Sequence, residues 1–180
     1  ARQLVDRGDD YAVIVTKTQE EIRWRADDSA WIVRTVDAAY GETAGLVVVD
    51  EAWDVKDEDV DEGIDPTRVA VEQSQLMLVS TAHRRARMLM RRRRAAAVES
   101  IAAREVTDDD EILIEWSTPR HFALDDVEGW RMASPHWTDQ RERLIRKNLR
   151  RVMAGGPSED PDESDPVEAL RAQWFNQWPT

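Results

Sequence analysis

The feature that most constrains the fold is a run of four apolar residues that ends in two carboxylates. Residues 46–51 read LVVVDE, so a β-branched apolar segment is followed directly by Asp50 and Glu51. Uninterrupted apolar runs of this length are typical of strands that are buried on both faces of a parallel sheet. Ligands of such sheets gather at the carboxyl ends of the strands. The run therefore predicts a buried central strand whose acidic end faces a ligand.

A second apolar segment, LMLVST at residues 76–81, also ends in polar residues. Between the two segments, Asp65-Pro66 predicts the start of a helix that reaches about Ser74, because Asp caps free N–H groups and Pro suits the first helical position. The acidic stretch 54–63 is expected to be an exposed loop. A strand, helix, strand succession requires a parallel sheet. The sequence therefore predicts that both polar strand ends lie at the same sheet edge.

Local patterning predicts the remaining elements. We expect further strands at 11–16, 31–33 and 112–116, and helices at 84–104, at 135–153 and after Asp165-Pro166. The stretch 158–165 is rich in acids and is expected to be a solvated linker. The two late helices carry apolar stripes, formed by Leu144, Ile145, Leu149 and Val152 and by Val167, Leu170, Trp174 and Trp178.

Composition narrows the class of protein. The 180 residues include no Cys, which excludes disulfides and cysteine-based zinc sites. No apolar run approaches the roughly 20 residues of a membrane span, so we expect no membrane association and a cytoplasmic location. The three His residues have no metal-ligand spacing, and the eight Trp residues are expected to serve in packing.

The net charge of −12 conceals an uneven distribution. Residues 50–65 hold nine acids and one Lys, residues 84–94 hold seven Arg and no acid, and residues 141–151 hold six basic residues and one Glu. A polyanion would meet the basic stretches rather than the mean charge. Solvated helix faces explain the same stretches equally well, so both interpretations stay open.

An acidic pair at a strand end has a specific use in nucleotide hydrolysis. In P-loop NTPases one carboxylate at this place helps to hold Mg²⁺, and a second can activate the attacking water. This is the Walker B pattern, with Asp50 as the candidate for Mg²⁺, directly or through water, and Glu51 as the catalytic candidate. The alternative is a pair of strand-end caps. The phosphate-binding pattern GxxxxGK[ST] does not occur in the 180 residues. Either the interpretation of Asp50 and Glu51 as half of a nucleotide site is wrong, or the missing half is expected upstream of Ala1.

Several segments resemble the large subunit of the terminases that package DNA in tailed phages. Residues 36–53 resemble that family's approach to its Walker B strand, and Ser80-Thr81-Ala82 resembles its coupling motif. Residues 130–136 are similar to a late segment that runs from Trp to "NP", with Ser134 where Asn is more usual. Residues 169–178, which end in Asn-Gln-Trp, are similar to the segment that closes the ATPase half. The two late segments are more specific than the acidic pair.

The resemblance implies a motor that uses ATP and Mg²⁺ to pump double-stranded DNA into a procapsid. It implies a homo-oligomeric ring on the portal protein in the bacterial host cytoplasm, assisted by a small terminase subunit. The implied fold is α/β: a partial P-loop NTPase of the additional-strand, catalytic-glutamate type, whose parallel sheet has flanking helices and lacks the phosphate-loop strand. Residues 1–156 would be the C-terminal part of the ATPase domain, and 157–180 an acidic linker and closing helix before a nuclease domain. Alone, such a fragment is expected to be inactive.

Further roles follow for the residues after the second strand. Ser80, Thr81 and Ala82 would sense the nucleotide state, and Arg84 and Arg85 are candidates for an arginine finger. The candidates for contact with DNA phosphates are Arg91, Arg92, Arg93 and Arg94. Two other interpretations remain. A helicase-like DExx NTPase also pairs an acidic strand end with a Ser/Thr-Ala triplet, and a non-catalytic prophage remnant could keep the same half-sheet.

Overall fold

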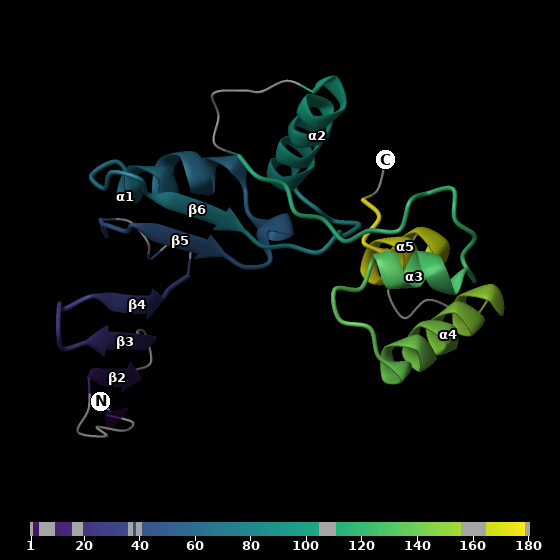
Figure 1. Ribbon diagram of the computed structural model, residues 1–180, viewed down its shortest axis with the longest axis horizontal. Coiled ribbons are helices and arrows are strands. Elements are labelled where there is room, and N and C mark those ends of the chain that lie inside the picture. The colour runs from purple at the N-terminus through teal and green to yellow at the C-terminus, as the bar shows by residue number, and fades with distance from the viewer. Residues whose placement is uncertain are drawn as a thin grey trace. The chain divides into compact units, whose positions relative to one another are not determined.

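The computed structural model describes residues 2–3, 10–15, 20–35, 38, 41–104, 111–155 and 165–178. The chain divides into two compact units, which are Ala1–Val47 with Asp57–Leu76 and Val48–Lys56 with Met77–Thr180. Figure 1 follows the elements along the chain.

The first unit contains a four-stranded antiparallel sheet in the order β1-β2-β3-β4. Its strands are β1 (Arg2–Gln3), β2 (Tyr11–Val15), β3 (Glu20–Trp24) and β4 (Ala30–Val33). β2 and β4 confirm two predicted strands, whereas β3 escapes prediction because its sequence, EEIRW, is largely charged. Val13 lies opposite Ile22, and Ile22 lies opposite Trp31, so cross-strand apolar pairs hold β3 in register.

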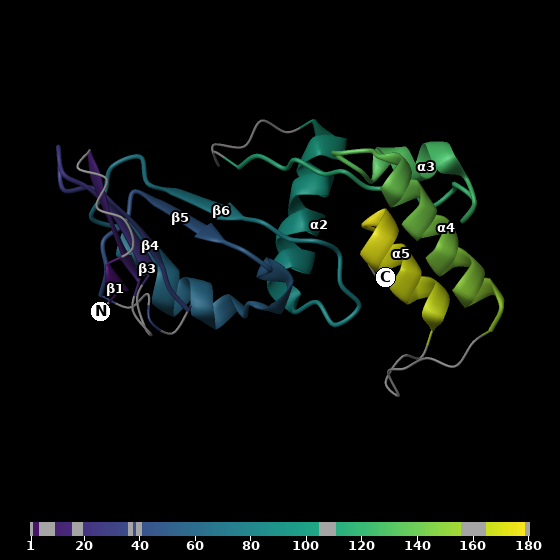
Figure 2. The ribbon, with the colours of Figure 1, turned by 90° about the horizontal axis from the view of Figure 1, so that it is seen from below.

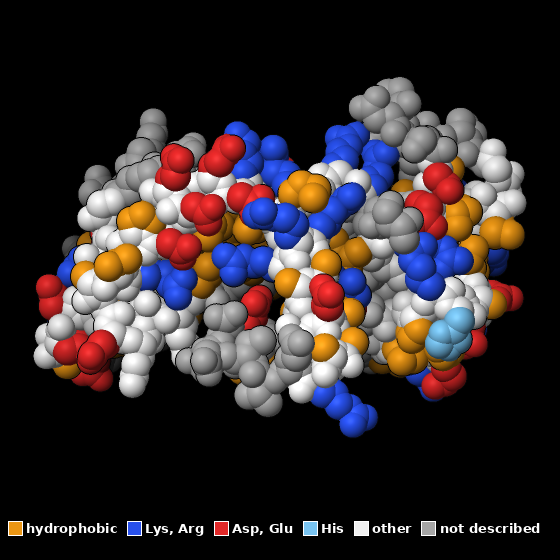
Figure 3. Space-filling model, turned by 90° about the horizontal axis from the view of Figure 1, so that it is seen from above, with side chains coloured by type: hydrophobic (Ala, Val, Ile, Leu, Met, Phe, Trp, Pro, Cys, Tyr) orange, Lys and Arg blue, Asp and Glu red, His pale blue; other side chains and the backbone are white. Residues whose placement is uncertain are grey.

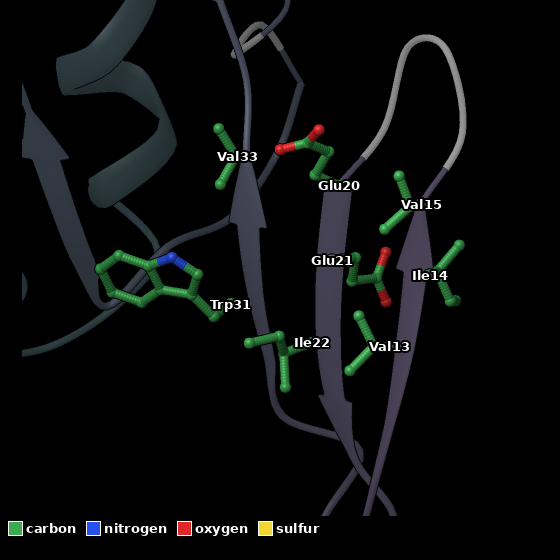
Figure 4. A pocket seen from close by; sticks show the side chains of 8 residues that line it. All are labelled: Val13, Ile14, Val15, Glu20, Glu21, Ile22, Trp31 and Val33. Atoms are coloured by element: carbon green, nitrogen blue, oxygen red, sulfur yellow. The ribbon is translucent and has the colours of Figure 1, made fainter. Parts of the chain in front are cut away.

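One face of this sheet is hollowed, as Figure 4 shows. The hollow has a volume of about 280 Å³, and most of the side chains that line it are apolar. The Glu21 side chain there is buried and pairs with Arg23 Nε at 2.6 Å. The Arg23 guanidinium thus balances the charge of this buried carboxylate.

The acidic stretch that was expected to be a loop is helical. The π-helix η3 (Asp59–Ile64) continues directly into α1 (Asp65–Arg68). Val60 and Ile64 are 0% and 2% exposed, and their spacing of four residues places both on one helix face. The prediction of a helix from Asp65 to Ser74 is also wrong, because Asp65 continues an existing helix that ends at Arg68.

Strands β5 (Leu46–Val49) and β6 (Gln75–Leu78) form a parallel pair. Gln75 N donates to the Gly45 carbonyl at 2.8 Å, and Val79 N donates to the Val49 carbonyl at 2.9 Å. The partners advance in the same direction along both strands, and Figure 1 shows the two arrows side by side. The predicted parallel strand, helix, strand unit is confirmed.

β5 is less buried than its apolar sequence predicts. Val49 is buried, but Leu46 and Val48 are 44% and 38% exposed. The expectation of a strand buried on both faces is therefore wrong. Within the described residues β6 is the strand neighbour of β5, and alternate side chains of β5 are exposed to solvent.

Helix α2 (Met88–Ala103) carries the arginine-rich stretch of the second unit. It begins four residues later than predicted, because Arg87 is extended, with φ −68° and ψ 170°. Arg84 and Arg85 therefore lie in a turn before the helix rather than on it.

Three helices of the second unit pack together: α3 (Val127–Met132), α4 (Asp139–Met153) and α5 (Pro166–Phe175) (Figure 2). Each begins at a side-chain cap, because Asp126, Thr138 and Asp165 accept hydrogen bonds from backbone N–H groups of the first turn. The helices enclose a core of four buried side chains, which are Trp130, Ile145, Leu170 and Phe175.

The predicted apolar stripes on α4 and α5 are confirmed with two exceptions. Ile145, Leu149 and Val152 of α4 belong to or pack against this core, whereas Leu144 is 42% exposed. Trp178 lies beyond the end of α5, which closes at Phe175, and so does not extend the stripe as a helical residue.

The segment 112–116 forms no strand, contrary to prediction. Its polar groups bond elsewhere: Glu115 pairs with Arg94 of α2, and the Trp116 carbonyl accepts a hydrogen bond from the Asn176 side chain. Ile112 and Ile114 are 84% and 70% exposed, so the alternating sequence does not reflect a packed sheet.

Two predictions concern parts of the chain that the structure does not test. The linker expected at 158–165 falls outside the described residues except for Asp165, and the division at residues 156 and 157 stays a prediction. Among the described residues, no helix has both the length and the apolar character needed to cross a membrane.

Gly129 supplies a test of the packing in the second unit. A Cβ atom there would lie 2.9 Å from Thr118 Cγ2 and 3.1 Å from Phe122 Cδ1. We expect Gly129→Ala to lower the free energy of unfolding by about 1–3 kcal/mol, measured by urea denaturation, because overpacking forces neighbours apart. Gly45→Ala is the control, since its Cβ would meet Val71 Cγ1 at an ordinary 3.6 Å. Equal losses in the two variants would contradict this account.

Candidate active site

The carboxyl ends of β5 and β6 lie next to each other. Beyond the bond between Val79 N and the Val49 carbonyl, Ala52 N donates to the Val79 carbonyl at 3.0 Å. The chain that leaves β5 therefore turns across the end of β6, where Ser80-Thr81-Ala82 follows. Ala52 and Ala82 are 0% and 1% exposed. The two polar segments do lie at one sheet edge, as predicted.

Asp50 and Glu51 form the turn at this edge. Glu51 adopts a left-handed conformation, with φ 51° and ψ 40°, and immediately precedes the 3₁₀ helix η2 (Ala52–Asp54). A side chain with a Cβ seldom takes this conformation, and such strain is concentrated at functional sites. Asp50 Oδ1 accepts a hydrogen bond from Glu51 N at 2.9 Å, which stabilises the turn. Both residues are exposed and can meet a ligand.

The Glu51 carboxylate is tied to a neighbouring indole. Trp53 Nε1 donates to Glu51 Oε2 at 2.6 Å. The Trp53 ring stacks on His83, with ring centroids 3.8 Å apart and an interplanar angle of 26°. Through Trp53, the acid at the end of β5 is connected to the segment that follows β6.

His83 has a lowered pKa. Burial disfavours its charged form first, and the adjacent cations Arg84 and Arg85 add to this effect, whereas Glu51 and Asp54 oppose it. His83 Nδ1 also accepts a hydrogen bond from Arg85 N at 3.2 Å. Burial and the two cations thus disfavour the charged ring against Trp53.

The arginines of the turn surround this connection. Arg87 N donates to the Trp53 carbonyl at 2.8 Å, and Arg87 Nε pairs with Asp54 Oδ1 at 3.0 Å. Arg84 and Arg85 follow His83 in sequence and act on it electrostatically. Arg84 and Arg85 thus lie in the turn after His83, and Arg87 directly precedes α2.

Asn176 holds the segment after β6 from another side. Its Oδ1 accepts a hydrogen bond from Ala82 N at 2.6 Å, and its Nδ2 donates to the Trp116 carbonyl at 2.9 Å. Asn176 ends α5 in a left-handed conformation with φ 49°, which Asn tolerates better than most residues. The neighbouring Gln177 donates through Nε2 to the Thr118 carbonyl at 2.7 Å. Asn176 therefore joins α5 to the segment after β6, and both residues join it to the segment 116–118.

The four arginines proposed for DNA contact differ in their surroundings. Arg94 pairs with both oxygens of Glu115, with Nη2 to Oε1 at 2.8 Å, and Glu115 also accepts from Ser117 Oγ at 2.6 Å. Arg91 and Arg93 are half-buried, and Arg92 is exposed. Figure 3 shows Lys and Arg side chains near the middle of the face drawn there, where α2 lies, with Asp and Glu side chains close by. The ion pair between Arg94 and Glu115 places an acid among the arginines of α2.

Within the described part of the chain, no three or more His, Asp or Glu residues come together as a complete metal site. The acidic pair can therefore supply only part of a cation's ligands. Mg²⁺ is usually held in this manner, by one or two carboxylates together with waters and substrate phosphates.

Sequence reasoning placed the acidic pair and the triplet correctly but missed what connects them. Trp53 was expected to serve in packing, His83 was noted only for its lack of metal-ligand spacing, and Asn176 entered only as part of a motif. Trp53 stands two residues after Glu51. An indole N–H donor so close to a carboxylate was the one sequence signal for a hydrogen bond between them. No pattern could reveal its stack on a ring 30 positions away.

Neither a protein-family model nor a curated protein sequence matches the chain. Among solved structures, the chain is similar to the large terminase of bacteriophage HK97, with a TM-score of 0.67 and 18% sequence identity. The similarity covers 92% of this chain and 33% of that chain. The chain has a terminase-like fold.

The terminase-like fold bears out the resemblance at the level of the fold. An identity of 18% establishes a shared fold rather than a shared activity, and the chain spans about a third of the length of the phage structure. The observed architecture is α/β, with a small parallel sheet and flanking helices.

Asn176 offers a test of how the terminase-like fold holds its segment after β6. We expect Asn176→Gly to lower the free energy of unfolding by about 1–3 kcal/mol, because the variant leaves the Ala82 N–H and the Trp116 carbonyl without their partner. Gly is favoured at positive φ, so the substitution should add no backbone strain. The control is Gln73→Gly at another left-handed position, φ 59°, which is exposed. Urea denaturation measures both, and an unchanged Asn176→Gly variant would refute the proposed anchor.

His83 should make stability depend on pH. Because its pKa in the folded protein is below the ordinary 6.5, the unfolded chain binds its proton more readily. The contribution of His83 to the free energy of unfolding is fully present above about pH 6.5 and is lost as pH falls through the pKa of the folded protein. NMR titration of the ring should give a pKa below 6.5, and His83→Phe should flatten this part of the stability profile. A pKa at or above 6.5 would contradict the burial argument.

Proposed function

We propose that this chain is part of an ATP-hydrolysing motor that packages double-stranded viral DNA into a procapsid, as a terminase large subunit does. The observation that carries the proposal is the acidic pair Asp50-Glu51 at the end of β5, beside the segment after β6, in a chain with a terminase-like fold. In open α/β sheets this edge is where ligands bind.

The proposed cofactors are ATP and Mg²⁺. The ion would neutralise charge on the phosphates of the nucleotide during transfer. Asp50 is the residue that would hold it, directly or through water, and its exposed carboxylate has the oxygen chemistry that Mg²⁺ prefers. Glu51 would accept the proton of the attacking water as a general base.

The segment after β6 is proposed to report the nucleotide state. Ser80, Thr81 and Ala82 adjoin the acidic turn, and the Ala82 N–H is bonded to Asn176 at the end of α5. A displacement at the sheet edge would therefore reach α5 through one hydrogen bond. Arg84 and Arg85, in the following turn, are the proposed arginine-finger residues.

The proposed partners are double-stranded DNA, a portal protein, a small terminase subunit and further copies of the chain in a ring, acting in the host cytoplasm. The arginines of α2 are the proposed contacts to DNA phosphates; among them Arg92 is exposed, and Arg94 also pairs with Glu115. Contacts of this kind are independent of sequence and weaken with salt.

The phosphate-binding half of the site is proposed to come from another part of the full protein. None of the seven glycines precedes a Lys, so the 180 residues contain no phosphate loop of the P-loop type. The 180-residue chain alone is therefore proposed to bind ATP poorly and to hydrolyse none.

A single substitution in the full protein tests the function. We expect Glu51→Gln to lower kcat for ATP hydrolysis by about 10²–10⁴-fold, because the amide cannot accept the proton of the attacking water, while ATP binding persists. Phosphate release and nucleotide binding are measured separately. The control is Glu62→Gln, which changes an exposed acid on η3 in the same manner. Normal turnover by Glu51→Gln would refute the role of Glu51.

A further inference from the structure

Trp53 has two contacts that no packing role explains. Its indole N–H donates to a carboxylate oxygen of Glu51, and its ring lies flat on the imidazole of His83. The side chain is half-buried rather than part of the core. It therefore occupies the space between the end of β5 and the segment after β6.

We propose that Trp53 is a positioning residue for Glu51, and that its stack on His83 couples the orientation of this acid to the segment after β6. The inference rests on the function proposed above and names the residue that orients its general base. A carboxylate must present one oxygen to the attacking water, and a bond to the other oxygen limits how the group can rotate. Trp53 Nε1 makes that bond to Oε2, so Oε1 is the oxygen that would accept the proton of the water.

The backbone fixes both ends of the connection. Arg87 N holds the Trp53 carbonyl at 2.8 Å, and Ala52 N holds the Val79 carbonyl at 3.0 Å. On the other side, Arg85 N donates to His83 Nδ1 at 3.2 Å, which sets the plane of the imidazole. Two rings with centroids 3.8 Å apart cannot slide independently without loss of contact. A shift of the turn 80–87 would therefore rotate the indole and with it the carboxylate.

The contact itself can be tested without catalysis. In the full protein, the Trp53 indole resonance is assigned in ¹H–¹⁵N NMR spectra as the one that Trp53→Phe removes. We expect Glu51→Gln and His83→Ala each to shift this resonance, because the first weakens the acceptor and the second removes the stacked ring. A Trp53 resonance that neither variant moves would overturn the inference.

The catalytic consequence is tested by kinetics. Trp53→Phe keeps a ring against His83 but removes the N–H donor, so we expect kcat to fall about 10-fold or more, while KM for ATP stays within about twofold. His83→Ala should also lower kcat, and His83→Phe, which restores a stacking ring, should recover most of it. Trp31→Phe in β4 makes the same chemical change in the other unit and should leave kcat unchanged.

The outcomes separate the two proposals. A protein whose Glu51→Gln variant is inactive but whose Trp53→Phe variant keeps full kcat retains the proposed function and overturns the positioning role. If His83→Phe and His83→Ala lower kcat equally while Trp53→Phe also lowers it, the stack on His83 does not matter for catalysis. That result would overturn the coupling to the segment after β6. A wild-type protein that hydrolyses no ATP in any assembly state would overturn both. Thermal unfolding of each variant checks that the loss is not one of folding.

Discussion

The parallel pairing of β5 with β6 is the interaction on which the candidate site depends. Hydrogen bonds from Val79 N to the Val49 carbonyl and from Ala52 N to the Val79 carbonyl join the two carboxyl ends. Because parallel strands end at the same edge, residues 50–53 and 80–83 meet although 30 positions separate them in the chain. Without this pairing, Asp50 and Glu51 would be two acids in an acidic turn.

Around that edge, the chain uses side chains to fix backbone that no regular element holds. Asp50 caps the turn after β5, Asn176 bonds the Ala82 N–H, and Trp53 joins Glu51 to His83. Each is a specific polar or stacking contact on a segment outside helices and strands or, for Trp53, in a single 3₁₀ turn. Exposed acids can be held in a defined orientation only by such contacts, since burial does not constrain them. The left-handed Glu51 is held in the same manner, by the bonds that flank it.

Helices of the second unit carry local start signals, although the sequence did not predict α3 and placed the start of α4 at residue 135 rather than at Asp139. Asp126, Thr138 and Asp165 each cap a helix, and the capping residue with proline at 165–166 is visible in the sequence. Strand predictions failed where pairing decided the outcome. Charged β3 forms because Ile22 pairs with Val13 and Trp31, whereas apolar 112–116 forms no strand because its polar groups bond to α2 and Asn176. The helical stretch 59–64 was hidden by its acids, although Val60 and Ile64 already had helical spacing.

The sequence by itself determined the acidic end of β5, the parallel strand succession and the resemblance that the terminase-like fold bears out. Those features are local or depend on the order of the elements along the chain. A strand, helix, strand order by itself places the carboxyl ends of both strands at the same sheet edge. The tertiary structure alone decided that Trp53 reaches Glu51 and His83, that Asn176 bonds to Ala82 and that Arg94 is held by Glu115. Such contacts depend on side-chain direction and on packing between distant segments, for which a linear pattern has no periodicity to report.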